Sequence, residues 1–461
     1  MLLARHIVGG VPCMDSTFYF QWQYLITHIN NLHYEKFQDG TVKCIEDEIP
    51  FEVPEGWCWC RLRDICMMLA GKSKPADQIK SEYFEGSYPC FGGNGIRGYV
   101  DEYNQDGTFS IVGRQGALCG NINVATGKFY ATEHAVVTTL FVGIDFKWSN
   151  YILEALRLNK YATGAAQPGL SVANILNVFV PIPPTQEQDR IGNNIDKSLK
   201  IIEVIEQEKT DLQKNIITAK SKILDLAIRG KLVPQAPNGE PASVLLERIR
   251  AEKEKLILQG KIKRDKKESV IFKGDDNSYY GISLPTGWSW TILKDISFSI
   301  SDGSHNPPSN KEFGVPLLSA ANVNNNSILI NNASRWITNE EWEIENQRTD
   351  IEIGDVLLTI VGSIGRSAVV ETNEHFALQR SVAVIKPCLI SPFYLMRIFQ
   401  APQIQKWIND NSKGTAQKGI YLNALSIMTV PIPPLDEQLR IVKQISIFFE
   451  QLDLISSSLL C

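Results

Sequence analysis

The sequence has few of the features that mark a secreted or membrane-bound protein. No run of about 18 apolar residues occurs among its 461 residues, so no membrane-spanning helix is expected. The N-terminus carries Arg5 but neither a sustained apolar stretch nor a small-residue cleavage site, which argues against a secretion signal. The nine cysteines are odd in number and irregularly spaced, as in a chain with reduced thiols. We therefore expect a cytoplasmic protein that does not bind membranes.

Patterns that usually carry catalysis are also missing. The six histidines do not pair at metal-binding or catalytic-triad spacing. Cys58 and Cys60 form a Cys-x-Cys without a second Cys or His pair at zinc-finger spacing. The glycine-rich stretch 92–95 lacks the Lys-Ser/Thr of a phosphate-binding loop. We predict no catalytic residue, no metal site and no cofactor bound by this chain itself.

One motif leaves an enzymatic alternative open. The stretch 306–309 reads Asn-Pro-Pro-Ser, which resembles the Asn-Pro-Pro-aromatic loop with which amino-methyltransferases hold a flipped adenine. Ser309 stands where the stacking aromatic would be, and no Gly-x-Gly after a strand offers a place for S-adenosylmethionine. An adenine methyltransferase is therefore the weaker reading.

Two segments of the chain occur twice. Residues 180–191 read Val-Pro-Ile-Pro-Pro-Thr-Gln-Glu-Gln-Asp-Arg-Ile, and 430–441 read Val-Pro-Ile-Pro-Pro-Leu-Asp-Glu-Gln-Leu-Arg-Ile, 250 residues later. A Pro-x-Gly-Trp-x-Trp start at Pro54 recurs 231 residues later at Pro285. The second copy therefore holds about 19 more residues between the two anchors. This predicts two copies of one unit.

Each copy has the pattern of an α+β globule. Short β-like runs at 109–113 and 136–141 in the first copy, and at 356–361 and 382–385 in the second, are broken by glycine and asparagine. At the ends of both copies we match the Gly113 turn with the Gly362 turn, and the Gly-x-x-Gln turns that end at Gln167 and Gln417. The ends are alike and the middles differ, as expected for one scaffold with two recognition surfaces.

A long helical pattern follows the first proline-rich segment. Pro181, Pro183 and Pro184 fix an extended entry. With Ile191 as a d position, nine of the eleven a and d sites up to Leu226 are apolar. This 3.5-residue period over five heptads predicts a coiled coil about 65 Å long. The same pattern restarts at Ile441 and ends at the C-terminus.

Charge alone does not identify a partner. The formal net charge is −5 and the pI about 5.8, but an acidic protein can still present a basic face. A short basic run at 261–267 is either a solvated surface or a phosphate contact.

Both globules carry side chains suited to reading DNA. Base-edge recognition uses Arg, Lys, Asn, Gln and His on loops, with further contacts to phosphates. The candidates are Lys72, Lys74, Asn94, Arg97, Arg114, Lys128 and His134 in the first copy, and Ser304, His305, Asn306, Lys311, Asn322, Arg366, Gln379, Arg380, Lys413 and Lys418 in the second.

These features together resemble the specificity subunits of type I restriction-modification systems, the HsdS family. The resemblance covers nearly everything from about His33 onward and rests on the twin Pro-x-Pro-Pro-x-x-Glu-Gln-x-Arg-Ile and Pro-x-Gly-Trp segments and the Gly-x-x-Gln turns. It also rests on Ala-Ile-Arg-Gly-Lys-Leu-Val-Pro at 227–234. The stretches Asp-Gly-Ser-His-Asn-Pro at 302–307 and 314–323 are together similar to a common version of the family's second recognition domain.

The resemblance implies two α/β target-recognition domains separated by long antiparallel coiled-coil helices, each domain reading one half of a split double-stranded DNA site. It implies no catalytic residues in this chain. The implied partners are two methyltransferase subunits, which use S-adenosylmethionine, and restriction subunits, which use ATP and Mg²⁺. If the globules instead bind protein, the chain would be a scaffold joined by its coiled coil.

The expected organisation has six parts. The second spacer helix is expected to be about half as long as the first, because the 250-residue offset aligns Cys461 with Asp211. The predicted boundaries are 1–44 for an N-terminal segment of unassigned structure, 45–185 for the first recognition domain, 186–235 for the central spacer helix, 236–284 for a linker with a short helix and the basic run, 285–434 for the second recognition domain, and 435–461 for the C-terminal spacer helix.

Overall fold

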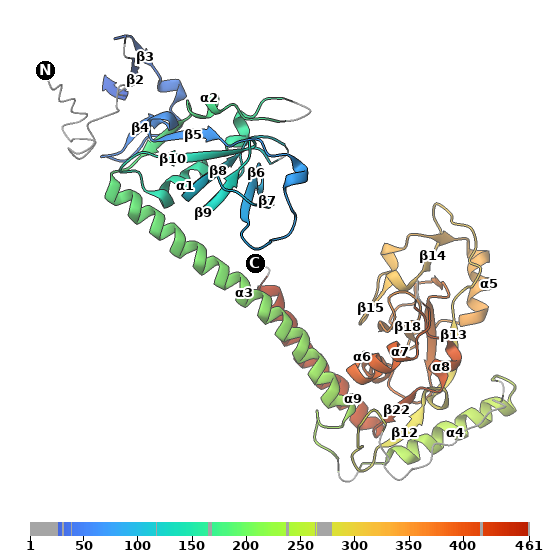
Figure 1. Cartoon of the computed structure of the whole chain (residues 1–461). Coiled ribbons are helices and arrows are strands. Elements are labelled where there is room, and N and C mark those ends of the chain that lie inside the picture. The colour runs from blue at the N-terminus through green and yellow to red at the C-terminus, as the bar shows by residue number, and fades with distance from the viewer. Residues whose placement is uncertain are drawn as a thin grey trace. The chain divides into compact units, whose positions relative to one another are not determined.

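Figure 1 shows a computed structural model of the chain. It describes residues 26–29, 32–37, 39–116, 118–164, 168–236, 239–262, 264, 279–414 and 418–459. Most of the N-terminal segment, Gln167, Gln417, Cys461 and most of the basic run lie outside these residues. The chain divides into two compact units, Met1–Ile205 and Glu206–Cys461, and the long helix α3 (Thr185–Ile228) contributes residues to both.

Unit 1 is built on a six-stranded sheet. Its order is β5-β10-β8-β9-β6-β7, and β-branched residues fill strands such as β10, Ala-Val-Val-Thr-Thr-Leu. Helix α1 (Phe146–Ala155) starts at Asp145, whose carboxylate accepts the Trp148 N–H at 2.8 Å. Trp148 packs with Val112 and Val136 of the sheet. The strands are β5 (Cys66–Ala70), β6 (Tyr88–Gly92), β7 (Gly95–Val100), β8 (Gln105–Gly113), β9 (Ile122–Ala131) and β10 (Ala135–Leu140).

Two smaller sheets complete unit 1. Strands β1 (Ile26–Ile29), β2 (Leu32–Lys36) and β3 (Val42–Cys44) form one sheet, and β4 (Cys58–Arg61) pairs with β11 (Phe179–Ile182). Glu35 of β2 is 2% exposed and accepts hydrogen bonds from Arg61 at 2.6 Å and from Arg63 at 3.2 Å. This buried ion pair attaches the N-terminal sheet to the rest of the unit. A short helix, α2 (Val172–Ile175), precedes β11.

Unit 2 repeats this plan with more elements in its middle. A four-stranded sheet has the order β13-β21-β18-β19, a three-stranded sheet the order β17-β14-β20, and β15 pairs with β16 and β12 with β22. The strands are β12 (Ser289–Ile292), β13 (Ser297–Asp302), β14 (Val315–Leu318), β15 (Val323–Asn324), β16 (Ser327–Ile328), β17 (Trp336–Ile337), β18 (Val356–Thr359), β19 (Ser367–Val369), β20 (Ala377–Leu378), β21 (Val382–Pro387) and β22 (Thr429–Ile432).

The helices of unit 2 cover its sheet and form a helix pair. Helix α6 packs against β18 and β19. Helix α5 begins with a capping box at Thr338, and it lies in the part of the second copy that is longer than the first. The helices other than α3 are α4 (Ala242–Leu258), α5 (Asn339–Thr349), α6 (Pro392–Gln400), α7 (Pro402–Asp410), α8 (Leu422–Ser426) and α9 (Leu435–Ser458).

The repeated proline-rich segments are edge strands paired with the repeated tryptophan segments. In unit 1 Pro181 lies opposite Trp59, and in unit 2 Pro431 lies opposite Trp290. A proline cannot donate a ladder hydrogen bond, so it is tolerated in such two-stranded edges. The two sequence repeats of each copy are therefore direct neighbours.

Helix α9 runs antiparallel to the end of α3 within unit 2. Near its start, Glu437 accepts a hydrogen bond from Gln235 at 2.7 Å, and near its end, Asp453 pairs with Lys220. Ile441 and Ile445 are fully buried in one cluster with Leu224 and Ile228. Burying one such side chain stabilises the pair by about 1.5–3 kcal/mol. The predicted fold class, two α/β units with antiparallel coiled-coil helices, is confirmed. No helix of the described residues has the length and apolarity needed to span a bilayer.

Candidate nucleic-acid interface

Both units contain the same backbone junction beside the end of a sheet strand. In unit 1 the Lys72 N–H donates to Ala131 O at 3.0 Å, and in unit 2 the Ser304 N–H donates to Leu378 O at 2.7 Å. The glycine before each has no room for a side chain. A Cβ on Gly71 would lie 2.0 Å from Ala131 O, and one on Gly303 would lie 2.1 Å from Leu378 O. This close approach explains why both copies carry glycine there.

A glycine loop closes the junction in each unit. The Gly116 N–H donates to Pro168 O at 3.0 Å, and the Gly362 N–H to Lys418 O at 3.1 Å. Both glycines have a positive φ, 92° and 82°, which favours glycine. The sequence match of the Gly113 turn with the Gly362 turn is wrong by three residues. Gln115 and Val361 bridge to the corresponding glycines Gly169 and Gly419, so Gly116 is the structural counterpart of Gly362.

In unit 2 this junction gathers most of the predicted DNA-reading residues. Ser304 bridges to Gln379, and the Arg380 N–H donates to Ser304 O at 2.9 Å. The glycine loop then leads to Lys418, and Lys413 bridges to Gly419. The exposed side chains at this junction are His305, Asn306, Arg380, Lys413 and Lys418, and we call this set the recognition strip of unit 2. The strip therefore presents cations and an imidazole to solvent from three separate loops.

Helix α5 holds the start of this strip. Asp302 is 7% exposed, and its carboxylate accepts hydrogen bonds from His305 Nε2 at 2.8 Å and from Arg348 at 2.5 Å. The Ser304 hydroxyl donates to Glu345 at 3.1 Å. Sequence reasoning missed Glu345 and Arg348, because an acidic helix without a base-reading pattern gives no sign that it supports a recognition loop.

In unit 1 the equivalent junction brings together a different set of residues. The Arg114 N–H donates to His134 O at 2.9 Å, and the backbone of Gly93 lies beside both Gln115 and His134. Asn94 next to it accepts a hydrogen bond from Asn121 at 3.1 Å. The predicted residues at this junction are Lys72, Asn94, Arg97, Arg114 and His134.

Two predicted lysines of unit 1 have intramolecular partners. Lys74 donates to Glu102 at 2.7 Å, its side chain is 9% exposed, and this hydrogen bond raises the pKa of Lys74. Lys128 lies over the ring of Tyr103, with 4.6 Å between Nζ and the ring centroid. Lys74 is therefore held away from any base edge, whereas the ammonium of Lys128 stays accessible.

Three predicted residues of unit 2 lie outside the strip. Asn322 is 5% exposed and donates to Asn332 O at 2.9 Å, so its amide caps a buried turn. Lys311 forms an ion pair with Glu341 at 3.3 Å. Arg366 follows the glycine loop and donates to Asn324 at 3.2 Å.

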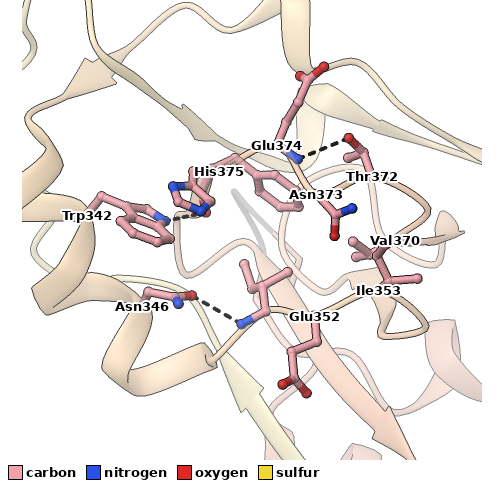
Figure 2. A pocket seen from close by; sticks show the side chains of 11 residues that line it. Trp342, Asn346, Glu352, Ile353, Val370, Thr372, Asn373, Glu374 and His375 are labelled. Carbon is pink, nitrogen blue, oxygen red and sulfur yellow. Dashed lines mark hydrogen bonds between the residues drawn. The ribbon is translucent and has the colours of Figure 1, made fainter.

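A separate pocket of about 280 Å³ lies on the other side of α5. Figure 2 shows Trp342 stacked on His375, with ring centroids 3.9 Å apart. The Trp342 Nε1–H donates to Phe376 O at 3.1 Å, and the Asn346 side chain accepts the Ile351 N–H at 3.1 Å. These polar groups are used to fix the end of α5. Among the residues that the structure describes, no cluster of three metal-binding side chains occurs.

Comparison with known proteins gives one consistent family. A family model described as the type I restriction modification DNA specificity domain matches residues 54–214 and 293–459. The EcoprrI type I restriction enzyme specificity subunit of Escherichia coli is 41% identical over 165 residues, which are 36% of this chain and 40% of that protein. The EcoEI specificity subunit of Escherichia coli is 24% identical over 515 residues, covering 92% of this chain and 83% of that protein. The chain thus spans less than half of the first relative and most of the second.

Solved structures agree at the level of the fold. The HsdS subunit from Thermoanaerobacter tengcongensis aligns with a TM-score of 0.53 at 17% identity, covering 89% of this chain and 93% of that one. A chain from a structure described as the basis of complex assembly and conformational transition of the type I R-M system aligns with a TM-score of 0.55 at 17% identity, covering 89% and 94%.

Proposed function

Because this chain belongs to the type I restriction-modification DNA specificity family, we propose that it reads a bipartite DNA sequence, one half-site through each unit. The observation that carries this proposal is the shared junction. Two units hold the same backbone hydrogen bonds at Lys72 and Ser304 yet present different side chains around them. A common frame with different exposed groups is what two different half-sites require.

The side chains at the two junctions suit hydrogen bonds to base edges in the major groove of DNA. Arginine donates two parallel hydrogen bonds to guanine, histidine and glutamine contact purine or pyrimidine edges, and lysine contacts phosphates. In unit 2, His305, Gln379 and Arg380 are the proposed base readers, and Lys413 and Lys418 the proposed phosphate contacts. In unit 1, Arg114, His134 and Asn94 are the proposed readers, with Lys72 and Arg97 beside them.

The helices supply the spacing in this proposal. Helix α3 is 44 residues long and α9 is 24 residues long. A helix rises about 1.5 Å per residue, so α3 alone is about 66 Å long. We propose that α3 sets the distance between half-sites.

The proposed partners are methyltransferase and restriction subunits, with two methyltransferase copies in the complex. The support is the family membership and the names of the relatives, which are subunits of type I restriction enzymes. S-adenosylmethionine, ATP and Mg²⁺ then belong to those partners. This chain contributes sequence recognition and no reacting group.

A domain exchange tests this function. Residues 300–385 are replaced by the equivalent segment of another family member, and the chain is expressed with its methyltransferase. Sequencing of modified adenines should show a bipartite motif in which only one half has changed. If both halves stay as they were, the second unit does not read DNA. If the complex with methyltransferase shows no salt-dependent binding to DNA, a protein scaffold is the better reading.

A further inference from the structure

Three consecutive asparagines form a turn beside two arginines in unit 2. Asn324 ends β15, and Asn325 and Asn326 connect it to β16. Asn326 has a φ of 71°, a left-handed conformation that asparagine tolerates better than most residues. Arg366 is one of the DNA-contact residues predicted from the sequence, whereas these asparagines and Arg397 have no predicted role.

Each asparagine accepts a hydrogen bond from the neighbouring elements. Arg366 Nη1 donates to Asn324 at 3.2 Å, and the Ser367 N–H donates to Asn325 at 3.2 Å. Arg397 Nη1 of helix α6 donates to Asn326 at 2.6 Å. The turn therefore ties two guanidinium groups into one polar cluster.

The positive charge of this cluster has no counter-ion in the described part of the chain. Every acceptor of Arg366 and Arg397 is a neutral amide, since Arg397 also donates to Gln400 at 3.0 Å and neither guanidinium forms an ion pair there. Burial lowers the pKa of Arg397 to about 10, and its Nε is buried without a hydrogen-bond acceptor. Both arginines are half-buried, and charged groups that are partly withdrawn from water are normally paired, so this arrangement lacks an anion.

The matching position in unit 1 holds an uncharged residue that contacts an acidic one. Asp145 and Ser391 cap helices α1 and α6, and the sixth residue after each cap is Tyr151 and Arg397 respectively. The Tyr151 hydroxyl donates to Asp196 of α3, which also pairs with Lys147 at 2.6 Å.

The helix of unit 2 offers no such carboxylate at the matching position. By the 250-residue offset that relates the two helices, Asp196 corresponds to Ser446. Arg397 packs instead over the ring of Phe449, with 5.0 Å between Cζ and the ring centroid. The uncompensated charge is therefore specific to the second copy.

The cluster adjoins the proposed recognition strip. Arg366 ends the glycine loop in which the Gly362 N–H donates to Lys418 O, and the Thr359 N–H donates to Arg366 O at 2.9 Å. One short loop thus connects Lys418 of the strip to Arg366 of the cluster.

We infer that Arg366 and Arg397 bind a phosphodiester of the DNA backbone at the edge of the second half-site. This rests on the proposed function. Guanidinium groups offer paired N–H donors that match phosphate oxygens, and the neutral asparagines orient them without cancelling their charge. Such contacts fix the register of a protein on DNA and carry no base preference. Among the predicted DNA contacts, Arg366 is thereby proposed to bind phosphate rather than a base edge.

The test measures how DNA affinity of the complex with methyltransferase depends on salt. The duplex carries the motif found by sequencing, and the variants are R366Q and R397Q. The slope of log affinity against log salt is negative, and each lost phosphate contact should make it shallower by about 0.9, while the methylated motif stays the same. K386M is the matched control, because Lys386 already pairs with Asp355 at 3.0 Å and with Glu352 at 3.1 Å.

Three results would overturn the inference. The first is an unchanged salt slope in both variants while the complex remains assembled. If R397Q folds poorly, R366Q alone provides this measurement. The second is an altered second half-site, which would make these arginines base readers. The third combines two observations: inorganic phosphate stabilises the wild-type chain but not R397Q, and the salt dependence of DNA affinity is the same for both. That result would indicate a site for free phosphate. A wild-type complex without sequence-selective binding would refute the proposed function itself.

Discussion

His305 and Asp302 are joined by a hydrogen bond of 2.8 Å between Nε2 of the imidazole and Oδ2 of the carboxylate. Arg348 holds the other carboxylate oxygen at 2.5 Å, so Asp302 is fixed on both sides. In a neutral imidazole, the nitrogen facing a carboxylate carries the proton and the other nitrogen accepts. When His305 is neutral, the contact with Asp302 therefore selects the tautomer in which Nδ1 is the acceptor, and such an acceptor suits the exocyclic amino group of adenine or cytosine.

Replacing Asp302 with asparagine should relax the sequence preference at one position of the second half-site. The amide can donate or accept, so it no longer selects one tautomer of His305. The expected loss of discrimination is about 1–3 kcal/mol, the value of one good base contact. Sequencing of methylated DNA measures it, and the first half-site serves as the internal control. A second half-site as narrow as in the wild type would show that His305 reads no base.

Replacing Gly303 with alanine should destabilise unit 2 by about 1–3 kcal/mol, because the added Cβ would lie 2.1 Å from Leu378 O and the backbone must shift. Thermal unfolding reports this change, and recognition of the second half-site should weaken with it. The control is Gly239→Ala, where the nearest atom is 3.4 Å away and φ is not positive. Equal melting temperatures for the two variants would contradict the close approach at Gly303.

Lengthening α3 by seven residues should lengthen the DNA spacer. Leu199, Ile202 and Ile205 are 43%, 49% and 56% exposed, so an insertion between Leu199 and Leu212 disturbs little packing. One heptad adds about 10 Å, or about three base pairs. Both half-sites should remain unchanged in the methylation motif. An unaltered spacer would mean that the helix does not set the distance.

Unit 1 should lose stability in acid through Glu35. Hydrogen bonding from Arg61 holds the pKa of Glu35 below its ordinary value of 4.5. The folded state therefore binds this proton less readily than the unfolded chain. The stabilisation is present above pH 4.5 and is lost as the pH falls through the lower folded pKa.

Replacing Glu35 with glutamine should abolish this acid-dependent loss of stability. It should also cost about 1–3 kcal/mol at neutral pH, because Arg61 and Arg63 lose their charged acceptor. Urea unfolding followed at several pH values measures both effects. Glu82→Gln is the control, since Glu82 is an exposed carboxylate of the same unit. The same pH dependence in wild type and E35Q would assign the acid sensitivity to another group.

The sequence was sufficient for the repeat, the fold class and the helix pair, since each depends on local patterns. Residue spacing could not show which loops meet. Ser304, Gln379 and Lys418 come together only through long-range backbone hydrogen bonds. The match of Gly113 with Gly362 failed by three residues, because both stretches read Ile-Val-Gly and only the backbone pairing with Gly169 and Gly419 shows which glycines correspond. Arg397 was missed because an arginine on a short amphipathic helix has no unusual pattern in sequence.

Asn322 and its neighbours also show that the sequence does not reveal which side chains are buried. Asn322 is buried in a turn, while Asn324 and Asn326, two and four residues later, orient arginines at the surface. All are asparagines in one stretch, and only tertiary contacts distinguish them.

The pairing of β4 with β11 and of β12 with β22 has an evolutionary consequence. In each unit the strand that enters the globule lies directly beside the strand that leaves it, Arg61 opposite Phe179 and Ser289 opposite Ile432. Each globule therefore begins and ends at the same pair of strands. A different globule could take its place as long as it kept that strand pair. Homologous recombination at the repeated segments could replace one globule in a single event, giving the host a new DNA target while the helices stay the same.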